Sequence, residues 1–368
     1  MITIDDLRRF AATRTFFPPT TLKRAIEKMG FVQADPIRSP ARAQDLILRH
    51  RVKSYRAGDL ERQYQKLGVE EDFFVTYGFV TASVNALMHP RSDTRVPADC
   101  NQPWHPSQTK RAEEVLEFVR ARGTVHPREV DEHFSHGKVT NYWGGSSNAT
   151  TQLLDAMLYR GLLRVERREA GIRLYTARVH QAAPEDLDEA RRRLDALADV
   201  AIRLYSPLTD ASLSDFVRRL RFAAPQWREE LVAARQRAKE RLSHAKIDGV
   251  DWYWPRGEDP SKSTVDDTVR LLAPFDPVVR DRARFELLWN WVYRFEAYTP
   301  PAKRKLGYYA LPLLWRGWVI GWANLAVKND ELVSEIGFVD KPPRDRAFKT
   351  ELEAELCRIR VFLGLVER

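Results

Sequence analysis

The most regular alternation of apolar and polar positions lies in the second quarter of the chain. Residues 107–123 place apolar side chains at helical spacing and end at a glycine suited to terminate a helix. Residues 126–134 carry a proline that fits the first turn of a second helix, and residues 146–161 open on serines suited to cap a third. Residues 162–179 predict two strands joined by a turn. Three helices followed by a hairpin is the order of a winged helix, with a recognition-like helix at 147–159.

A similar order of elements recurs further along the chain. Residues 184–205 predict a long helix, residues 212–220 a short one and residues 224–242 a third. Asp248-Gly249 then marks a hairpin between alternating apolar positions. The N-terminal part is less regular and is a candidate for a third, decorated copy. Its pattern predicts helices near residues 4–12, 20–29, 58–67 and 81–88.

From about residue 271 the pattern changes to alternating apolar segments. Turns at Arg316-Gly317 and at residues 328–330 separate these segments, which predicts a β-meander. An amphipathic helix over residues 345–362 closes the chain. We therefore predict the α+β class, with tandem winged-helix domains and a small C-terminal β-sheet domain.

These patterns divide the chain into four segments. Residues 1–105 form the N-terminal helical or winged-helix domain, and residues 106–182 form a winged-helix domain. Residues 183–262 form a third winged-helix-like domain, and residues 263–368 form a C-terminal α/β domain. The polar stretch 258–267 is the best candidate for a linker.

Composition narrows the class of protein. The chain has 60 Lys and Arg against 51 Asp and Glu, a net charge of +9 at pH 7. This surplus favours a polyanionic partner, although it also fits a basic protein without one. Only Cys100 and Cys357 occur, which excludes a disulfide scaffold, a CxxC zinc site and a four-cysteine iron–sulfur cluster. No apolar run approaches 18 residues and no signal-peptide core is present, so we expect a cytoplasmic protein.

The stretch FVQADPIRSPARAQDL combines an amide, a carboxylate and two cations. The residue before a proline is pushed out of the helical region, so Pro36 favours an extended backbone before it. In an extended backbone, Gln33 and Asp35 would share one face. Arg38 and Arg42 follow closely. The alternative is that Asp35 is a turn residue whose carboxylate only accepts a backbone hydrogen bond.

The stretch TPPAKRKLGYYALP combines prolines, cations and tyrosines. Lys303, Arg304 and Lys305 are consecutive, and Tyr308 follows three residues later. Cations beside aromatic rings suit a nucleic-acid surface or a wedge near unstacked bases. The alternative is a loop that leads into a core strand.

Two other charged clusters have structural and functional interpretations. Arginines of the predicted hairpin at 162–179 could contact phosphates or could lie on a solvated face. They are Arg164, Arg167, Arg168 and Arg173. The second cluster, PFDPVVRDRARFE, includes Asp276, Arg280, Asp281 and Arg282. We interpret it as mainly structural, with a turn at Asp276 and ion pairs among its own side chains.

Three of these motifs together resemble the winged-helix DNA glycosylases of the YcaQ/AlkZ type. They are QAD followed by RSPARAQDL, then PFDPVVRDR, and then YRFEAYTPPAKRKLGYYALPLLWRGWVIGW, in that order. The resemblance spans essentially the whole chain and is strongest from 271 to 325. The family's catalytic signature maps to Gln33, Ala34 and Asp35, on the YcaQ-like side. Where members tend to have a histidine and an acid, this sequence has Tyr77-Gly78.

The resemblance implies a monofunctional DNA glycosylase that needs no metal or other cofactor. Its implied substrate is the N-glycosidic bond of alkylated purines such as N7-alkylguanine, with unhooking of interstrand crosslinks as an extension. Asp35 and Gln33 would be catalytic. The implied DNA-binding residues are Lys303, Arg304, Lys305, Arg38, Arg42 and Tyr308.

The implied partner is double-stranded DNA that contains alkylated bases. We expect a monomer that acts in the cytoplasm, is associated with the nucleoid and has no membrane contact. The alternative class is a noncatalytic winged-helix DNA-binding or regulatory protein. Such a protein usually binds as a symmetric dimer, and the sequence has no heptad zipper.

Overall fold

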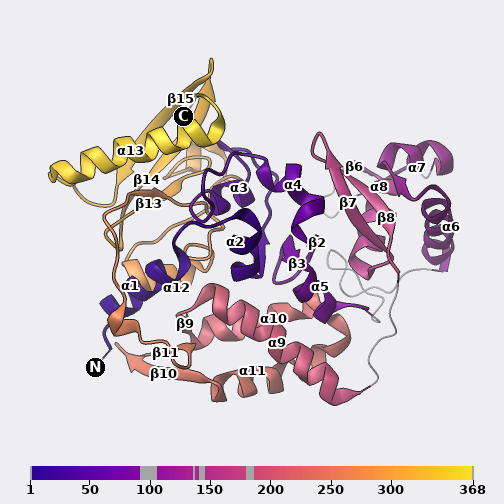
Figure 1. The fold of residues 1–368 in the computed structure, drawn as a ribbon, viewed down its shortest axis with the longest axis horizontal. Coiled ribbons are helices and arrows are strands. Elements are labelled where there is room, and N and C mark those ends of the chain that lie inside the picture. Colours follow the sequence, from indigo (N-terminus) through magenta and orange to yellow (C-terminus); the bar gives the residue numbers. More distant parts are fainter. Residues whose placement is uncertain (1, 92–105, 136, 141–145, 180–185, 367–368) are drawn as a thin grey trace. The chain divides into compact units, whose positions relative to one another are not determined.

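The computed structural model describes residues 2–91, 106–135, 137–140, 146–179 and 186–366 (Figure 1). The chain forms two compact units, each discontinuous in sequence. Unit 1 contains Met1–Leu60, Asp199–Phe216 and Arg235–Arg368, and unit 2 contains Glu61–Ala198 and Val217–Ala234. The four-segment division remains a prediction. Within the described ranges, no helix has both the length and the apolar character to cross a membrane.

The N-terminal part of unit 1 leads the chain into a short strand. Helix α1 (Ile4–Thr15) starts with a capping box, in which Thr3 and Asp6 satisfy each other's backbone N–H groups. Helix α2 (Leu22–Met29) ends at Gly30, whose φ of 72° lies in the left-handed region. Gly30 thus turns the chain directly from α2 into strand β1 (Phe31–Gln33), and helix α3 (Ala43–Leu48) follows.

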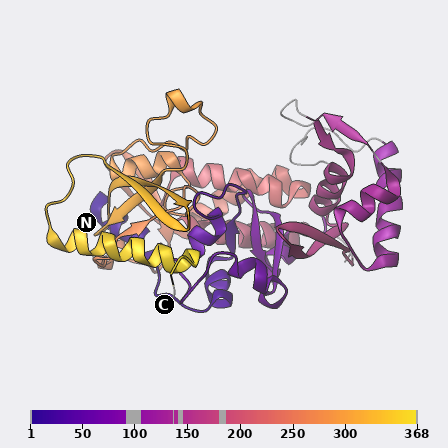
Figure 2. The same ribbon diagram turned by 90° about the horizontal axis from the view of Figure 1, so that it is seen from above.

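The C-terminal part of unit 1 is an antiparallel sheet covered by a helix. The strand order is β12-β13-β14-β15, with bounds Arg270–Leu271, Leu311–Trp315, Trp318–Lys328 and Glu331–Phe338. Helix α13 (Arg346–Leu363) lies along this sheet, and Phe348 contacts the rings of Trp315 and Phe338 (Figures 1 and 2). The predicted β-meander and closing helix are confirmed.

A second small sheet of unit 1 has the order β10-β11-β9. The bounds are Leu242–Ile247, Val250–Pro255 and Leu208–Thr209. Asp248 and Gly249 both have positive φ and close the predicted hairpin. The core of unit 1 includes Trp252, Phe285 and Leu314, so it joins this sheet, helix α12 (Arg282–Trp289) and strand β13.

Four helices contain residues of both units. They are α4 (Asp59–Leu67), α9 (Leu187–Tyr205), α10 (Asp210–Ala223) and α11 (Leu231–Glu240). Short 3-10 helices η1 (Pro225–Glu230), η2 (Pro260–Lys262) and η3 (Pro301–Lys303) complete the helical elements described.

Unit 2 has a hairpin, followed by helices and a small sheet. Strands β2 (Val69–Phe73) and β3 (Tyr77–Thr81) are antiparallel, and helix α5 (Ala82–Met88) follows them. The later helices are α6 (Pro106–Arg122), α7 (Pro127–Phe134) and α8 (Ala149–Arg160). The later strands are β4 (Thr124–Val125), β5 (Lys138–Thr140), β6 (Ser146–Asn148), β7 (Leu163–Glu169) and β8 (Ile172–Ala177).

The predicted order of three helices and a hairpin therefore occurs over residues 106–177, but one boundary was wrong. Helix α8 starts at Ala149, because Asn148 rather than a serine caps it by accepting from the N–H groups of Thr150 and Thr151. The residues before Asn148 belong to strand β6.

The stretch 258–267, predicted as a linker, lies inside unit 1. Arg14 of α1 holds Glu258 through two hydrogen bonds of 2.7 and 2.9 Å. Helix η2 also packs against α1. The polar composition of this stretch thus reflects surface exposure and not a boundary between compact units.

Candidate active site

Strand β1 places Gln33 at the edge of the unit 1 core. Phe31 and Val32 are buried, and Gln33 is half-buried at the end of the strand. The first two residues anchor the strand because they are apolar. Gln33 follows these buried residues and is itself partly exposed to solvent.

Asp35 lies just beyond the strand in a turn. Its Oδ1 accepts the N–H of Ile37 at 2.9 Å, and its own N–H donates to Oε1 of Gln44 at 3.4 Å. The hydrogen bond that the turn interpretation predicted is therefore present, but it occupies one carboxylate oxygen. Among the described residues no ion pair to Asp35 is found. Burial raises the pKa of Asp35 above its ordinary value, and the Ile37 hydrogen bond only partly offsets this.

Gln33 is held by an arginine from a distant part of the sequence. The Nε–H of Arg280 donates to Oε1 of Gln33 at 2.8 Å. The guanidinium of Arg280 also lies near the rings of Tyr205 and Phe216, at 5.8 and 5.5 Å from their centroids. These two rings stack on each other with centroids 4.1 Å apart. Arg280 is therefore fixed between an aromatic pair and the amide.

The turn that carries Arg280 is braced by two buried arginines. Arg51 binds both oxygens of Asp276, at 2.9 and 3.0 Å, and both side chains are fully buried. The backbone oxygen of Asp276 accepts the N–H of Arg280 at 2.8 Å. Arg284 donates to the carbonyl oxygens of Pro277 and Val278, at 2.6 and 2.8 Å. PFDPVVRDR is therefore a rigid turn, as predicted, but its ion pair is with Arg51 and not within the motif.

Tyrosines from the segment after α12 lie within electrostatic reach of Asp35. Burial raises the pKa of Tyr309, and the charge of Asp35 raises it further. The same two causes, in the same order, raise the pKa of Tyr298. Tyr309 is buried, and its hydroxyl has no hydrogen-bond partner within the described part of the chain. Tyr298 is 80% exposed, so an exposed aromatic ring lies within electrostatic reach of Asp35.

The cation cluster lies on a braced loop of unit 1. Glu296 accepts the backbone N–H groups of Lys305 and Leu306, at 2.8 and 2.7 Å. Burial opposes ionisation of Glu296, but these hydrogen bonds outweigh it and lower the pKa of Glu296. Figure 2 shows the loop around η3, in orange, projecting from the sheet of unit 1 on the side away from the yellow helix α13.

Two of the three cations on this loop point to solvent. Lys303 and Lys305 are exposed, and the described residues include no ion pair for either. Arg304 instead donates to the carbonyl oxygen of Thr299 at 2.7 Å and lies 5.0 Å from the ring centroid of Tyr308. Tyr308 is 43% exposed. The loop thus presents two ammonium groups and an aromatic ring, while Arg304 helps to shape it.

The remaining predicted DNA-binding residues lie directly after Asp35. Arg38 is exposed, and Arg42 is half-buried at the start of α3. They share a chain segment with the candidate catalytic pair. Their contact with DNA remains a prediction.

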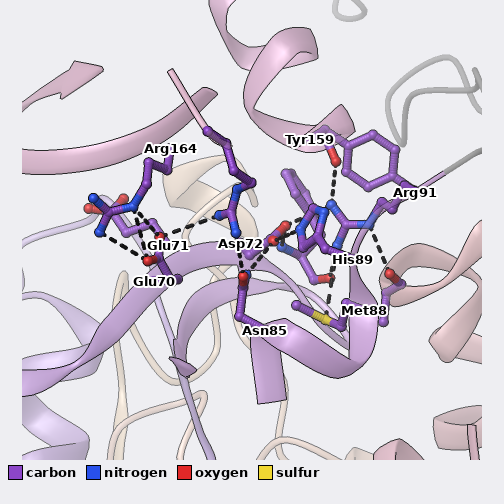
Figure 3. Close-up of polar contacts among 12 residues, drawn as sticks. Glu70, Glu71, Asp72, Asn85, Met88, His89, Arg91, Tyr159 and Arg164 are labelled. Carbon is purple, nitrogen blue, oxygen red and sulfur yellow. Dashed lines mark hydrogen bonds and ion pairs between the residues drawn. The ribbon is translucent and has the colours of Figure 1, made fainter. Parts of the chain in front are cut away.

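Each arginine of the β7–β8 hairpin is paired with an acid of unit 2. Arg164 binds Glu70 at 3.0 Å and Arg168 binds Glu71 at 2.6 Å. Arg167 pairs with Glu169 at 2.8 Å and Arg173 with Asp155 at 2.9 Å. Figure 3 shows the contact of Arg164 with Glu70. The phosphate-binding hypothesis for these arginines has no support, because neighbouring carboxylates already neutralise them.

Tyr77-Gly78 forms part of the β2–β3 hairpin and not a catalytic pair. The hydroxyl of Tyr77 donates to Glu71, and Gly78 pairs with Asp72 across the hairpin. A histidine–acid pair does occur nearby, since Nε2 of His89 lies 2.6 Å from Oδ2 of Asp72 (Figure 3). Burial, together with the charge of Arg91, lowers the pKa of His89 to about 4. A neutral imidazole therefore donates to Asp72.

The Asp72 carboxylate is the centre of a buried network (Figure 3). Arg91 donates to its Oδ1 at 2.8 Å and Asn85 donates to its Oδ2 at 2.9 Å. Burial by itself would raise the pKa of Asp72, but the charge of Arg91, the contact with His89 and the N–H of Phe73 together outweigh it and lower that pKa. Because the partners of the Asp72 carboxylate all belong to unit 2, we interpret this network as structural.

The comparison with known families agrees with the motifs that surround Gln33, Asp35 and Arg280. Residues 26–362 match the AlkZ-like family, described as DNA glycosylase AlkZ-like. The chain belongs to this family of DNA glycosylases. It is also similar in fold to the solved structure of the DNA glycosylase AlkZ from Streptomyces sahachiroi, with a TM-score of 0.62. That match has 15% sequence identity and covers 98% of this chain and 97% of that chain.

Family membership confirms the resemblance that the sequence motifs indicated, and with it a DNA repair glycosylase. Gln33 ends strand β1, and Asp35 lies two residues further along the chain. Arg280 contacts Gln33, and Tyr298 and Tyr309 lie within electrostatic reach of Asp35, but the sequence did not identify these three residues as neighbours of the pair. Arg280 was interpreted as structural, although its place in PFDPVVRDR, one of the three motifs on which the resemblance rests, was a usable signal. Tyr298 and Tyr309 belong to the long motif at 293–322, but nothing in their spacing indicated that they approach Asp35.

Proposed function

We propose that this protein is a monofunctional DNA glycosylase that hydrolyses the N-glycosidic bond of N7-alkylated purines. The proposal rests on the surroundings and the ionisation of the Asp35 carboxylate. Its carboxylate is half-buried, has a raised pKa and has no cationic partner among the described residues. A carboxylate that is not neutralised within its own unit is suited to stabilise a positive charge on a substrate.

The chemistry of an N7-alkylated purine supplies that charge. The C1′–N9 bond breaks and its electron pair moves to the purine, which neutralises the charge at N7. The sugar becomes an oxocarbenium-like cation, by analogy with glycoside hydrolysis. Asp35 would stabilise this cation and accept a proton from the water that attacks C1′, while Gln33 would orient that water. Because water is the nucleophile, no lysine nucleophile is required. The products are a free base and an abasic sugar.

DNA binding is assigned to the basic surfaces of the chain. We assign Lys303 and Lys305 to phosphate contacts, with Tyr308 against an exposed base, because these side chains project on one braced loop. Arg38 and Arg42 would contact the strand that holds the lesion. Helix α8, which lies within the order of helices and hairpin at 106–177, is proposed to meet the duplex as the recognition helix of a winged helix.

The proposal extends to interstrand crosslinks joined through N7 of guanine. An N7-alkylated guanine is cationic before cleavage whatever the size of the N7 substituent, so the bond-breaking step is the same. The exposure of Tyr298 and Tyr308 is consistent with an open site that accepts a bulky group.

A direct test compares a cationic lesion with a neutral one in the same duplex. We expect release of N7-methylguanine and no release of O6-methylguanine, because only the first base leaves with its charge neutralised. The product should be an abasic site, and borohydride should trap no covalent enzyme–DNA adduct. Equal release of both bases would contradict the proposed chemistry. Saturable preference for one undamaged sequence, with no base release from any lesion, would favour the noncatalytic alternative.

A further inference from the structure

We propose that Arg280 is a positioning residue that sets the orientation of the Gln33 carboxamide, so that its NH2 group is the end offered to the reaction. This inference rests on the proposed function, because it assigns a role within that site. It identifies a residue from the PFDPVVRDR turn as part of the machinery that acts through Gln33.

The donor chemistry of arginine fixes which end of the amide it holds. A guanidinium has only donors, so the Gln33 atom 2.8 Å from Arg280 Nε must be the carbonyl oxygen. The NH2 group is then the other end of the planar amide. An amide without such a partner would be free to turn over and present either end.

The position of Arg280 is itself determined by the fold. Its backbone N–H is bound by the carbonyl oxygen of Asp276, which Arg51 anchors in the core. Its guanidinium lies against the stacked rings of Tyr205 and Phe216. A group that is held from both the backbone and the side chain can transmit a defined geometry to its partner.

This orientation gives the two candidate catalytic side chains different roles, with Gln33 as a hydrogen-bond donor and Asp35 as the proton acceptor. With Oε1 turned towards Arg280, the NH2 group of Gln33 is the end that can donate a hydrogen bond to a lone pair of the attacking water. A neutral carboxamide is not a base, so Gln33 does not take the proton of that water. Asp35, whose Oδ2 has no hydrogen bond within the described part of the chain, is left as the acceptor.

A different role for Arg280 would be a phosphate contact. Its two Nη groups have no hydrogen bond to other described residues, so charge alone could also draw DNA. The two roles differ in what they change. A positioning residue changes the rate of the bound complex, and a phosphate contact changes affinity and its dependence on salt.

The test uses single-turnover release of N7-methylguanine by the full-length protein. The variants are Arg280→Met, Arg280→Lys, Gln33→Ala and the Arg280→Met/Gln33→Ala double variant. Arg344→Met, which removes an exposed arginine of unit 1, is the matched control for loss of one charge. We expect Arg280→Met to lower the maximal rate by about 100-fold. The half-saturating DNA concentration should stay within about twofold of wild type.

Three further results complete the expected pattern. Arg280→Lys should not restore the rate, because an ammonium keeps the charge but lacks the planar fork. Arg280→Met should have little additional effect once Gln33 is already alanine, because the two residues act as a unit. Arg344→Met should leave the maximal rate unchanged.

Several outcomes would overturn the inference. They are full activity of Arg280→Met, recovery by Arg280→Lys, or the same fold-loss from Arg280→Met with and without Gln33. A loss confined to DNA affinity would assign Arg280 to phosphate instead. Should wild type release no N7-methylguanine, the proposed function fails, and the side-chain amide NMR signal of Gln33 still decides the inference. That signal should move in Arg280→Met and Arg280→Lys and stay in place in Arg344→Met.

Discussion

Asp35 and Gln33 are two residues apart, yet their surroundings differ in kind. Gln33 is bound by a cation, Arg280, and Asp35 has no cationic partner among the residues described. Because an amide carries no charge, Arg280 orients Gln33 without cancelling a charge that the reaction needs. Leaving Asp35 unpaired keeps its charge available to a substrate, and its raised pKa reflects the free energy of holding that charge in a half-buried position.

The raised pKa of Asp35 predicts an acidic limb in the pH profile. Catalysis requires the ionised carboxylate, so the rate should fall as pH drops through the folded-state pKa of Asp35. That pKa lies above the ordinary value for an aspartate. No second limb is expected near neutral pH, because the N7-alkylated base is charged without protonation. Single-turnover rates between pH 4 and pH 9 check this, and a rate that rises steadily as pH falls would contradict it.

Asp35→Asn should leave the folded state at least as stable as wild type at neutral pH. A folded-state pKa above the unfolded value means that the aspartate favours folding below the unfolded pKa. This contribution is lost as pH rises through the folded pKa. Asparagine carries no charge at any pH and retains an Oδ1 that can accept from Ile37. Thermal unfolding at pH 7 should give an equal or higher Tm for the variant, with the difference narrowing in acid. A Tm clearly below wild type would indicate a structural role for the charge.

At the scale of elements, the site depends on a turn that is held from the core. Strand β1 brings Gln33, and the turn after β12 brings Arg280, although about 247 positions separate them in sequence. Local patterns can predict β1 and the Asp276 turn separately. The contact between Gln33 and Arg280 is supported by the Arg51–Asp276 pair. The periodicity of neither stretch predicts that pair.

Breaking the Arg51–Asp276 pair should destabilise the fold strongly. Asp276→Ala would leave the Arg51 guanidinium buried without its carboxylate, which costs about 3–5 kcal/mol in comparable cases. Chemical denaturation should show this loss. The matched control is Asp267→Ala, which removes an exposed partner of Arg316 and should cost less than about 1 kcal/mol. A small effect of Asp276→Ala would show that the turn is held by Arg284 instead.

The sequence predicted most regular elements but missed others for physical reasons. The meander, the closing helix and the Asp248-Gly249 hairpin follow from alternation and turn chemistry, which are local. Helix α3 and the β2–β3 hairpin were missed. The short length of α3 gives little periodicity. In β2 the charged Glu71 and Asp72 are buried by pairing with distant arginines, which hides the apolar alternation of a strand.

At the scale of the whole molecule, the basic residues serve two different purposes, since some form ion pairs within the fold and others are exposed. Many arginines are used inside the fold, as in the pairs of Arg51 with Asp276 and Arg168 with Glu71. The net charge therefore indicated a polyanionic partner without indicating where it binds. Exposed lysines without ion pairs, such as Lys303 and Lys305, are better candidates for phosphate contacts.

Replacing Lys303 and Lys305 should weaken DNA binding in a salt-dependent way. Each lysine that contacts a phosphate contributes about 1 to the slope of log affinity against log salt concentration. Lys303→Ala/Lys305→Ala should therefore reduce the slope by about 2. Lys349→Ala, on the exposed face of α13, is the matched control and should leave the slope unchanged. An unchanged slope in the double variant would place the DNA elsewhere.

The central claim is that the Asp35 carboxylate is essential for cleavage of the glycosidic bond of a cationic purine. Single-turnover release of N7-methylguanine from a duplex, measured with wild type and Asp35→Asn at saturating protein, tests it most directly. We predict a rate for Asp35→Asn that is lower by about 10²–10⁴-fold, with unchanged DNA affinity. Equal rates for the two proteins would contradict the assignment of Asp35 and, with it, the proposed mechanism.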